Sequence, residues 1–261
     1  MRLLVDYGNT RLKWALDGSH GIEPGAAFAH AGHAGDAALA GLWSTLPRPQ
    51  SIHVASVVDA AREAALRSAL VARFDREVEF VRSPPAALGI VNAYREPARL
   101  GVDRFLALAA VHAEAARAQV LVGCGTALTL DALDASGHHL GGLILPSPTL
   151  MRRALGVATA RVGEAGGRLV EIAGDTADAA WSGPALAAVA VVERFRAEVA
   201  RRLGSAVALV GDGGGLDEWR HLLPDLERAH DLVLRGLALW AGSCATAAEP
   251  PPPGPAPPPR G

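Results

Sequence analysis

Short apolar segments separated by glycine-containing turns occur in the same order in both halves of this chain. The first half begins with RLLVDYG and LKWALDG, joined by a Gly-Asn-Thr turn that predicts a hairpin. The second half begins with QVLVGCG, ALTLDAL and HHLGGLILP, three predicted strands in a row. Helices and single strands alternate after each opening. The repeated order predicts an α/β protein with two duplicated domains and a cleft between them.

The remaining elements follow from composition and periodicity. Helices are expected over residues 35–45, 60–74, 99–117, 175–203 and 231–244, and further strands over 25–30, 51–58, 78–81 and 206–215. We expect an N-terminal domain over 1–117, a C-terminal domain over 118–246 and a disordered tail over 247–261. The tail holds eight of the eighteen prolines, which form neither a helix nor an interior strand.

Charge and cysteine content argue against several classes of protein. The 261 residues carry a formal net charge of −2 without a basic run, which gives little support to nucleic-acid binding. Cys124 and Cys244 match neither a disulfide framework nor a metal motif, and His138 and His139, in a predicted turn, lack metal-ligand spacing. No apolar stretch approaches the ~20 residues that cross a bilayer, and a secretory signal is lacking. We expect a soluble, cytoplasmic protein that binds neither nucleic acid nor membrane.

Four glycine-containing segments follow predicted strands, at residues 6–10, 123–126, 141–146 and 211–215. None matches a Walker or a complete dinucleotide-binding pattern, and each alone could be an ordinary turn. Together, two hairpins at matching positions of the two halves could hold a polyphosphate from both sides through backbone N–H groups. The hydroxyls of Thr10 and Thr126 would add donors.

Residues beside these turns suit phosphate chemistry. Asp6, at the end of the first strand, could hold a hydrated Mg²⁺, which binds through one or two carboxylates and phosphate oxygens. Lys13 could place a positive charge against the phosphates, and a solvated strand residue is the alternative. The glycines at 213–215 would let the backbone approach a base or ribose closely, or would form a loop without a ligand.

The segment AYREPARLGVDRFLALAA carries a second candidate site. Asp103 and Arg104 fall near the start of the helix predicted over 99–117. An acid in a first helical turn is favoured by the helix dipole, which is a structural explanation for Asp103. Alternatively, Asp103 accepts a proton from a substrate hydroxyl and Arg104 binds an anionic group. A phosphotransfer enzyme needs both roles beside its phosphate site.

Six motifs in this order resemble the type III pantothenate kinases, of the acetate kinase/sugar kinase/Hsp70/actin superfamily. They are DYGNTRLK (6–13), AYREPARLGVDR (93–104), GTALTLD (125–131), GGLILP (141–146), DTADAAWSG (175–183) and LVLRGLALWA (232–241). The resemblance implies two ribonuclease H-like domains of the actin-like ATPase superfamily. It implies ATP-dependent phosphorylation of pantothenate, the first step toward coenzyme A. It also implies a homodimer that uses ATP, Mg²⁺ and often a monovalent cation, K⁺ or NH₄⁺.

The resemblance also assigns residues to ligands. The first phosphate loop would comprise Asp6, Tyr7, Gly8, Asn9, Thr10, Arg11, Leu12 and Lys13, with Asp6 reaching Mg²⁺ through water. ATP would further contact Gly125 and Thr126, with Gly213 and Gly214 from the glycine cluster on the adenosine side. Pantothenate would contact Tyr94, Gly101, Val102, Asp103, Arg104 and Thr176, with Asp103 as the proton acceptor.

Two positions depart from the family pattern. The aspartate that usually stands two residues before the second Gly-Thr, and usually ligates potassium, is Gly123 here. We therefore assign no potassium ligand, since Asp131 lies at the far end of its strand. The glycine that usually follows the proline of the GGLILP-type motif is Ser147, which affects the loop more than the chemistry.

Two alternative functions stay open at this point. A sugar kinase or a polyphosphate-cleaving phosphatase could use the same fold, because a fold does not settle a substrate. A regulatory protein could keep the nucleotide fold without turnover. Asp6, Lys13, Asp103 and Arg104 argue for retained chemistry, because a scaffold has no need of all four.

Overall fold

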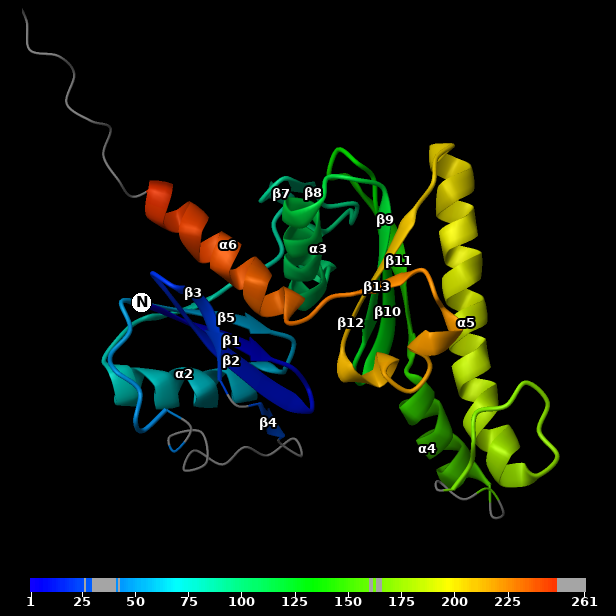
Figure 1. Ribbon diagram of the computed structural model, residues 1–261. Helices are drawn as coiled ribbons and strands as arrows, with labels where there is room; N and C mark the ends of the chain where they lie inside the picture. The colour runs from blue at the N-terminus through cyan, green and yellow to red at the C-terminus, as the bar shows by residue number, and fades with distance from the viewer. Residues whose placement is uncertain (26, 30–40, 42, 160–161, 163–165, 248–261) are drawn as a thin grey trace, which may run out of the picture.

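The computed structural model describes residues 1–25, 27–29, 41, 43–159, 162 and 166–247, which form two lobes (Figure 1). The first lobe contains a sheet in the order β3-β2-β1-β5-β6, with β4 paired to β2. Its strands are β1 (Arg2–Tyr7), β2 (Arg11–Gly18), β3 (Gly21–Pro24), β4 (Phe28–Ala29), β5 (Ser51–Ser56) and β6 (Val78–Phe80). β1, β2 and β3 are antiparallel neighbours, and β5 and β6 run parallel to β1. The hairpin predicted at the start of the chain is confirmed.

The second lobe repeats this sheet. Its order is β11-β10-β9-β12-β13. Its strands are β9 (Gln119–Cys124), β10 (Ala127–Leu133), β11 (His139–Pro146), β12 (Ala208–Asp212) and β13 (Leu226–Arg228). β9, β10 and β11 are antiparallel neighbours, and β12 and β13 run parallel to β9. Strand order and direction match the first sheet, so the prediction of duplicated ribonuclease H-like domains is confirmed.

The main helices are α2 (Ala60–Phe74), α3 (Val102–Glu114), α4 (Pro148–Ala158), α5 (Thr176–Leu203) and α6 (Leu232–Ala247). The shorter elements are η1 (Pro97–Arg99), η2 (Gly214–Leu216), η3 (Arg220–Leu222), β7 (Ala86–Ala87) and β8 (Ile90–Val91). In the part of the chain that the structure describes, no helix is both long and apolar enough to cross a membrane.

The helices form a layer between the two sheets and cover both outer faces (Figure 1). α3 and α6 lie in the middle, in one core with Leu4 of the first sheet and Leu121 of the second. α2 packs on the other face of the first sheet, against Leu3. α5 packs on the other face of the second sheet, against Val120 and Val122. Successive residues of a strand point to opposite faces, which explains why neighbours in sequence enter different cores.

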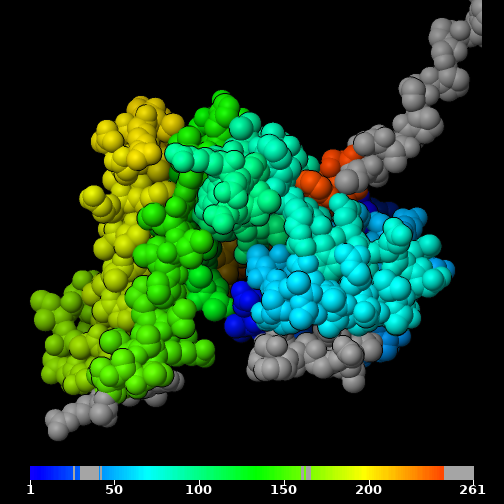
Figure 2. Space-filling model, turned by 180° about the vertical axis from the view of Figure 1, so that it is seen from behind, coloured from blue at the N-terminus to red at the C-terminus, as the bar shows by residue number. Residues whose placement is uncertain are grey.

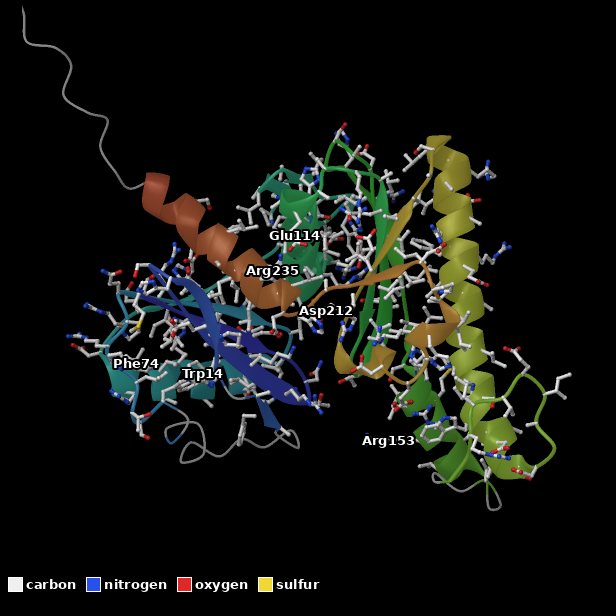
Figure 3. All side chains as sticks on the ribbon, viewed as in Figure 1. Trp14, Phe74, Glu114, Arg153, Asp212 and Arg235 are labelled. Carbon is white, nitrogen blue, oxygen red and sulfur yellow. The ribbon has the colours of Figure 1, made fainter. Side chains whose placement is uncertain are left out.

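α6 returns to the first lobe, although it follows the second sheet in sequence. It packs on α3 and on the strands β1 and β5. Arg235 of α6 pairs with Glu114 of α3 (Figure 3). The division of the chain into two domains at residue 117 stays a prediction. The last helix of the second predicted domain, α6, lies alongside the first lobe.

Several predicted boundaries shift for local reasons. Of the strand predicted over 25–30, residues 28–29 form β4, which pairs with β2. β2 also pairs with β3 over residues 21–24, which the sequence did not predict. The helix predicted over 99–117 begins at Val102, because η1 occupies the preceding turn and Gly101 is the N-cap. Of the helix predicted over 35–45, only residues 41 and 43–45 are described, and the proline-rich tail lies outside the described residues.

Candidate active site

The two glycine-containing hairpins meet between the lobes. The β1–β2 and β9–β10 turns approach so closely that the side-chain hydroxyls of Thr10 and Thr126 hydrogen-bond at 2.9 Å. Figure 2 shows the hollow between the lobes, with atoms of the N-terminal segment, in blue, at its edge. Both turns therefore present small residues and hydroxyls to one space, as a site for a polyphosphate requires.

The side chains of the first hairpin divide into two groups. Tyr7 and Leu12 are buried in the core beneath α2, so only their backbone can face a nucleotide. Arg11 is exposed, and the side-chain oxygen Oδ1 of Asn9 accepts a hydrogen bond from Arg62 Nη2 at 3.3 Å. Gly8 donates its N–H to the Arg11 carbonyl at 3.0 Å and closes the turn.

Asp6 lies among three other carboxylates at the end of β1. Burial and the nearby charge of Asp103 raise the pKa of Asp6 to about 7, with smaller contributions from Asp212 and Asp231. Lys13 is the positive charge that opposes this rise. Arg228 Nη1 also lies 3.6 Å from Asp212 Oδ1, and the charge of Arg104 acts on Asp103. The pKa of Asp6 stays raised despite these cations, and a bound cation would relieve the remaining repulsion at this carboxylate.

Asp212 and Asp231 were not predicted as part of the site. Lys13 Nζ donates to Asp231 Oδ1 at 3.0 Å. The oxygens of Asp212 accept the backbone N–H groups of Gly213 at 2.6 Å and Leu232 at 2.9 Å, so this residue holds the start of α6. Figure 3 shows Asp212 between the lobes, near the start of that helix. Asp212 is the last residue of β12, and Asp6 is the last but one residue of β1, so the same signal, an aspartate at the end of a strand, was present in the sequence.

The residues around Asp6 fit a hydrated Mg²⁺. Among the described residues, no group of three or more His, Cys, Asp or Glu side chains is arranged to hold a metal ion. Mg²⁺ does not require such a group, because it keeps several waters and binds through one or two carboxylates and phosphate oxygens. The raised pKa of Asp6 reports the uncompensated charge that such an ion would neutralise.

Asp103 occupies the first turn of α3, as predicted. Its Oδ1 accepts the backbone N–H of Arg104 at 2.8 Å. Burial raises the pKa of Asp103, although this hydrogen bond and the Arg104 charge oppose the rise. A carboxylate with a raised pKa is a stronger proton acceptor than a solvated one. Because Asp103 also raises the pKa of Asp6, the two carboxylates lie within electrostatic reach of each other.

Arg104 is buried in a polar cluster with residues of the second lobe. Its Nε and Nη2 donate to the two oxygens of Asp131 at 2.8 and 2.7 Å. Its Nη1 donates to the Tyr94 hydroxyl at 3.1 Å. His139 Nε2 lies 2.9 Å from Asp131 Oδ1, and the rings of His139 and Tyr94 are stacked with centroids 6.0 Å apart. His139 lies in β11, so the prediction that it sits in a turn is wrong.

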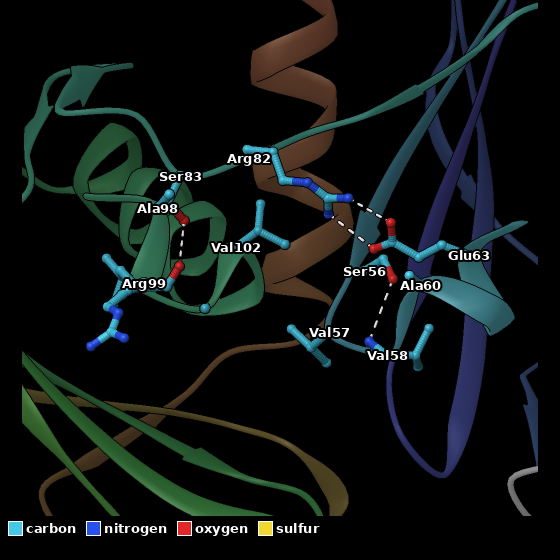
Figure 4. Close-up of a pocket in the computed structure, with 12 residues that line it drawn as sticks. Ser56, Val57, Val58, Ala60, Glu63, Arg82, Ser83, Ala98, Arg99 and Val102 are labelled. Atoms are coloured by element: carbon cyan, nitrogen blue, oxygen red, sulfur yellow. Dashed lines mark hydrogen bonds and ion pairs between the residues drawn. The ribbon is translucent and has the colours of Figure 1, made fainter. Parts of the chain in front are cut away.

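A cavity of about 420 Å³ adjoins the first turn of α3 (Figure 4). Gly101 and Val102 form one wall, and Val57 at the end of β5 forms another. Glu63 and Arg82 also line the cavity and form a two-point ion pair, at 3.0 and 2.5 Å. Its walls come from separate segments, which explains why sequence analysis did not find it. The cavity provides room for a small molecule next to the candidate base.

The glycine cluster after β12 packs on the end of β9. Gly213 has a φ of 102°, and a Cβ there would lie 2.2 Å from the Cys124 carbonyl oxygen. A Cβ at Gly215 would lie 2.7 Å from the Cys124 sulfur. Burial raises the pKa of the Cys124 thiol to about 11, so this side chain packs and does not react. The close approach brings Gly213 and Gly214 beside the second hairpin.

Gly123 and Thr129 form a cross-strand pair next to the second hairpin. A Cβ at Gly123 would lie 2.6 Å from Thr129 Oγ1. An aspartate at this position would therefore displace Thr129. Asp131, the other candidate ligand, is engaged by Arg104. The residues present do not fit the potassium site that the resemblance implies.

Thr176 lies apart from the other candidate residues. It begins α5, which covers the face of the second sheet that carries Val120 and Val122. Arg104 meets Asp131 on the opposite face, toward α3. Within one chain, the second sheet therefore separates Thr176 from Arg104.

Gly142 is required by the contact between Arg104 and Asp131. A Cβ at this position would lie 2.6 Å from Arg104 Nη2, 2.6 Å from Asp131 Oδ1 and 2.1 Å from the Leu130 carbonyl oxygen. We expect Gly142→Ala to lower the free energy of unfolding by about 1–3 kcal/mol, because overpacking forces backbone or side chains to move.

Urea denaturation measures this change. Gly174→Ala is the matched control, because a Cβ at Gly174 meets no atom within 4 Å. The control should stay within about 0.5 kcal/mol of the wild type. Equal stability of the two variants would contradict the proposed crowding.

Two ribonuclease H-like sheets that bring paired hairpins and partly buried carboxylates to one space define a protein of the actin-like ATPase superfamily. A sequence profile described as type III pantothenate kinase matches residues 2–198. The chain belongs to the type III pantothenate kinase family, whose activity is the ATP-dependent phosphorylation of pantothenate in coenzyme A biosynthesis.

Curated relatives agree with this assignment over nearly the whole chain. The type III pantothenate kinase of Xanthomonas campestris pv. campestris strain B100 is 45% identical over 240 residues, which cover 91% of this chain and 96% of that protein. The corresponding enzyme of Xanthomonas oryzae pv. oryzae strain PXO99A is 44% identical over 246 residues, covering 93% and 98%.

Solved structures share the fold at low sequence identity. A protein from Campylobacter jejuni named for the Baf family of transcriptional activators matches with a TM-score of 0.62 and 18% identity, covering 94% of this chain and 99% of that one. A protein from Sinorhizobium meliloti named as a 2-dehydro-3-deoxygalactonokinase matches with a TM-score of 0.61 and 16% identity, covering 95% and 100%. At these identities, the likeness concerns the fold alone.

Proposed function

We propose that Asp103 accepts the proton of the primary hydroxyl of pantothenate while that hydroxyl oxygen attacks the γ-phosphorus of ATP. The bond from the γ-phosphorus to the bridging oxygen breaks, and ADP leaves with the electron pair. The observation that carries the proposal is the meeting of the two hairpins at the hydrogen bond between Thr10 and Thr126, with the partly buried Asp6 and Asp103 within electrostatic reach of each other. This arrangement supports the assignment of Asp103 as a base beside Asp6, the residue expected to bind the metal ion and the phosphates.

Both hairpins would hold the nucleotide. The backbone N–H groups of Gly8 and Gly125 close the two turns by donating to the Arg11 and Ala127 carbonyls. The triphosphate would therefore bind the backbone N–H groups of residues 9, 10 and 126 and the two threonine hydroxyls. Asp6 would hold Mg²⁺ through water, and this ion when bound supplies positive charge to the phosphates. Lys13 would add charge beside it, and Gly213 and Gly214 would face the adenosine.

The acceptor would lie between Asp103 and the cavity beside α3. Gly101 and Val102 line that cavity, which supports their assignment to the acceptor site. Arg104 would bind the carboxylate of pantothenate, because a guanidinium presents paired donors to a carboxylate. The Tyr94 hydroxyl is held next to it by Arg104 Nη1.

A homodimer would complete this site. Large apolar side chains are exposed on β11, on α4 and just before α5, with Ile144 at 64%, Val157 at 86% and Ile172 at 93% exposure. Such side chains on one region support an interface with another protein surface. A second copy could bring its own Thr176 to the acceptor site, which the same chain cannot do.

We place this enzyme in the cytoplasm, where the biosynthetic activity of the family is expected.

Measuring ADP release from ATP and Mg²⁺, with and without pantothenate, tests the proposed function. A panel of sugars and other hydroxyl compounds serves as the control for acceptor choice. Release that depends on pantothenate alone is the expected result. Release with a sugar alone would indicate another kinase of the superfamily. Nucleotide binding without turnover would indicate a regulatory protein. The Campylobacter jejuni protein of similar fold is named for a family of transcriptional activators, which is why this alternative is tested.

The same assay tests the cation requirement. Because Gly123 supplies no carboxylate and Thr129 fills the adjacent space, we expect the pantothenate-dependent rate to be nearly the same in sodium and in potassium buffer. Ammonium buffer is a third arm. A rate that collapses in sodium and returns in potassium or ammonium would show that other groups form a cation site.

A further inference from the structure

We infer that Asp131 and His139 are positioning residues that aim Arg104 at the carboxylate of the acceptor, and so set the preference for an anionic acceptor. The inference rests on the proposed function, because it assumes that Arg104 binds the acceptor. None of the sequence motifs pointed to His139, and Asp131 was considered only as a cation ligand.

The first step is the contact between Asp131 and Arg104. Two parallel hydrogen bonds, at 2.8 and 2.7 Å, fix the plane of the guanidinium along its Nε and Nη2 edge. The Arg104 side chain is 7% exposed and the Asp131 side chain 1%. A guanidinium has five N–H groups, and these two bonds leave its Nη1 side for the Tyr94 hydroxyl and a ligand. Asp131 thus determines which edge of Arg104 faces the acceptor site.

The second step is the contact between His139 and Asp131. His139 Nε2 lies 2.9 Å from Asp131 Oδ1, the oxygen that also accepts from Arg104 Nη2. The His139 side chain is fully buried, and its ring stacks on Tyr94 with an interplanar angle of 16°. His139 therefore contacts both residues that touch Arg104. It fixes the carboxylate on one side and the tyrosine ring on the other.

Stability alone does not account for this cluster. Replacing a buried ion pair by apolar residues of similar size is often neutral or stabilising. The cluster joins β10 and β11 of the second lobe to α3 of the first, next to the candidate base. Asp131 also balances the positive charge of Arg104. Because net charge at this pair is then small, the preference for an anionic acceptor depends on where the remaining N–H groups of Arg104 point. A change in that direction should reduce binding of the carboxylate more than binding of the rest of the acceptor.

Kinetics with two acceptors test the inference. One is pantothenate, and the other is its alcohol analogue, in which a hydroxymethyl group replaces the carboxylate. His139→Phe keeps an aromatic ring against Tyr94 and removes the hydrogen bond to Asp131. We expect kcat/KM for pantothenate to fall about 3- to 10-fold, mainly through KM, as the loss of one hydrogen bond implies. kcat/KM for the analogue and KM for ATP should change little.

Three further variants make the result specific. His139→Gln retains a side-chain N–H donor and should restore most of the preference. His138→Phe is the matched control, because His138 is exposed and contacts Asp134, outside the cluster. Asp131→Asn keeps the size of the side chain and removes its charge. If His139→Phe does not fold, the ratio of kcat/KM for pantothenate to kcat/KM for the alcohol analogue is measured with Asp131→Asn instead.

The outcomes separate the two proposals. An equal loss for both acceptors in folded His139→Phe or Asp131→Asn would overturn the positioning role. A wild-type protein that uses both acceptors equally would overturn it as well. A wild-type protein that phosphorylates neither acceptor would instead overturn the proposed function.

Discussion

Replacing Asp103 by asparagine is expected to lower kcat by about 10²–10⁴-fold, the usual contribution of a positioned base. Asparagine has nearly the size of aspartate and cannot accept a proton at neutral pH. Its side-chain oxygen can still accept the backbone N–H of Arg104, which Asp103 accepts at 2.8 Å. The loss should therefore appear in turnover and not in folding. Pantothenate-dependent ADP release under saturating ATP measures it.

Two comparisons make the Asp103 result interpretable. Asp225→Asn alters an exposed aspartate paired with Arg196 and should keep wild-type turnover. Thermal unfolding should show that Asp103→Asn is at least as stable as the wild type, because burial raises the pKa of this carboxyl and so disfavours its charged form. Folded Asp103→Asn with near-wild-type turnover would remove Asp103 from the mechanism.

The pH dependence of the wild type should report the same group. A base must be deprotonated to act, so kcat/KM should fall as the pH drops through the raised pKa of Asp103. The acidic limb should lie above the ordinary aspartate pKa of 3.8, because burial shifts it upward. Asp103→Asn should remove the contribution of Asp103 to this limb and keep the contribution of Asp6, whose pKa is about 7.

Local patterns in the sequence were sufficient to predict the antiparallel hairpins of the two sheets, although β3 and β13 were missed. A hairpin and alternating apolar residues specify neighbouring strands directly, so β1 with β2 and β9 with β10 follow from short segments. Asp6 and Lys13 face each other in the register of the first hairpin, so their proximity was also predictable. The repeated order then indicated that a second hairpin would meet the first.

Contacts between distant segments could not be predicted in this way. Lys13 pairs with Asp231, 218 residues away, because α6 returns to the first lobe. Arg104 meets Asp131 only because the middle layer of helices lies on the second sheet. His139 is an ordinary strand residue by composition, and its burial against Asp131 depends on the register of β10 and β11. The polar neighbours of each motif residue could therefore be identified only from the three-dimensional fold.

Replacing Asp6 by asparagine is expected to remove activity and to stabilise the ligand-free protein. Turnover should fall on the order of 10²–10³-fold, the typical loss when a group that organises charge at the reacting phosphate is removed. Stability should rise because the wild-type carboxylate is buried near three others, which raises its pKa from 3.8 to about 7. Removing its charge also removes that repulsion.

The pH dependence of stability follows from the direction of this shift. A carboxyl with a pKa of about 7 in the folded protein and 3.8 in the unfolded chain holds its proton more tightly when folded. The stability that this group contributes is therefore present at acidic pH and is lost as the pH rises through about 7. Asp6→Asn lacks this loss. Its advantage over the wild type should grow from near zero at pH 4 to roughly 1–3 kcal/mol at pH 8.

Thermal unfolding of both proteins across this pH range, with and without Mg²⁺ and ATP, distinguishes the two effects. Asp225→Asn, an exposed site, should follow the wild type throughout. Mg²⁺ with ATP should stabilise the wild type more than Asp6→Asn, since ligand binding to the folded state adds stability only where the ligand binds. A variant that is less stable than the wild type at pH 8 would show that Asp6 is held by favourable contacts. In that case the crowding of carboxylates would not be the property that draws a cation to this site.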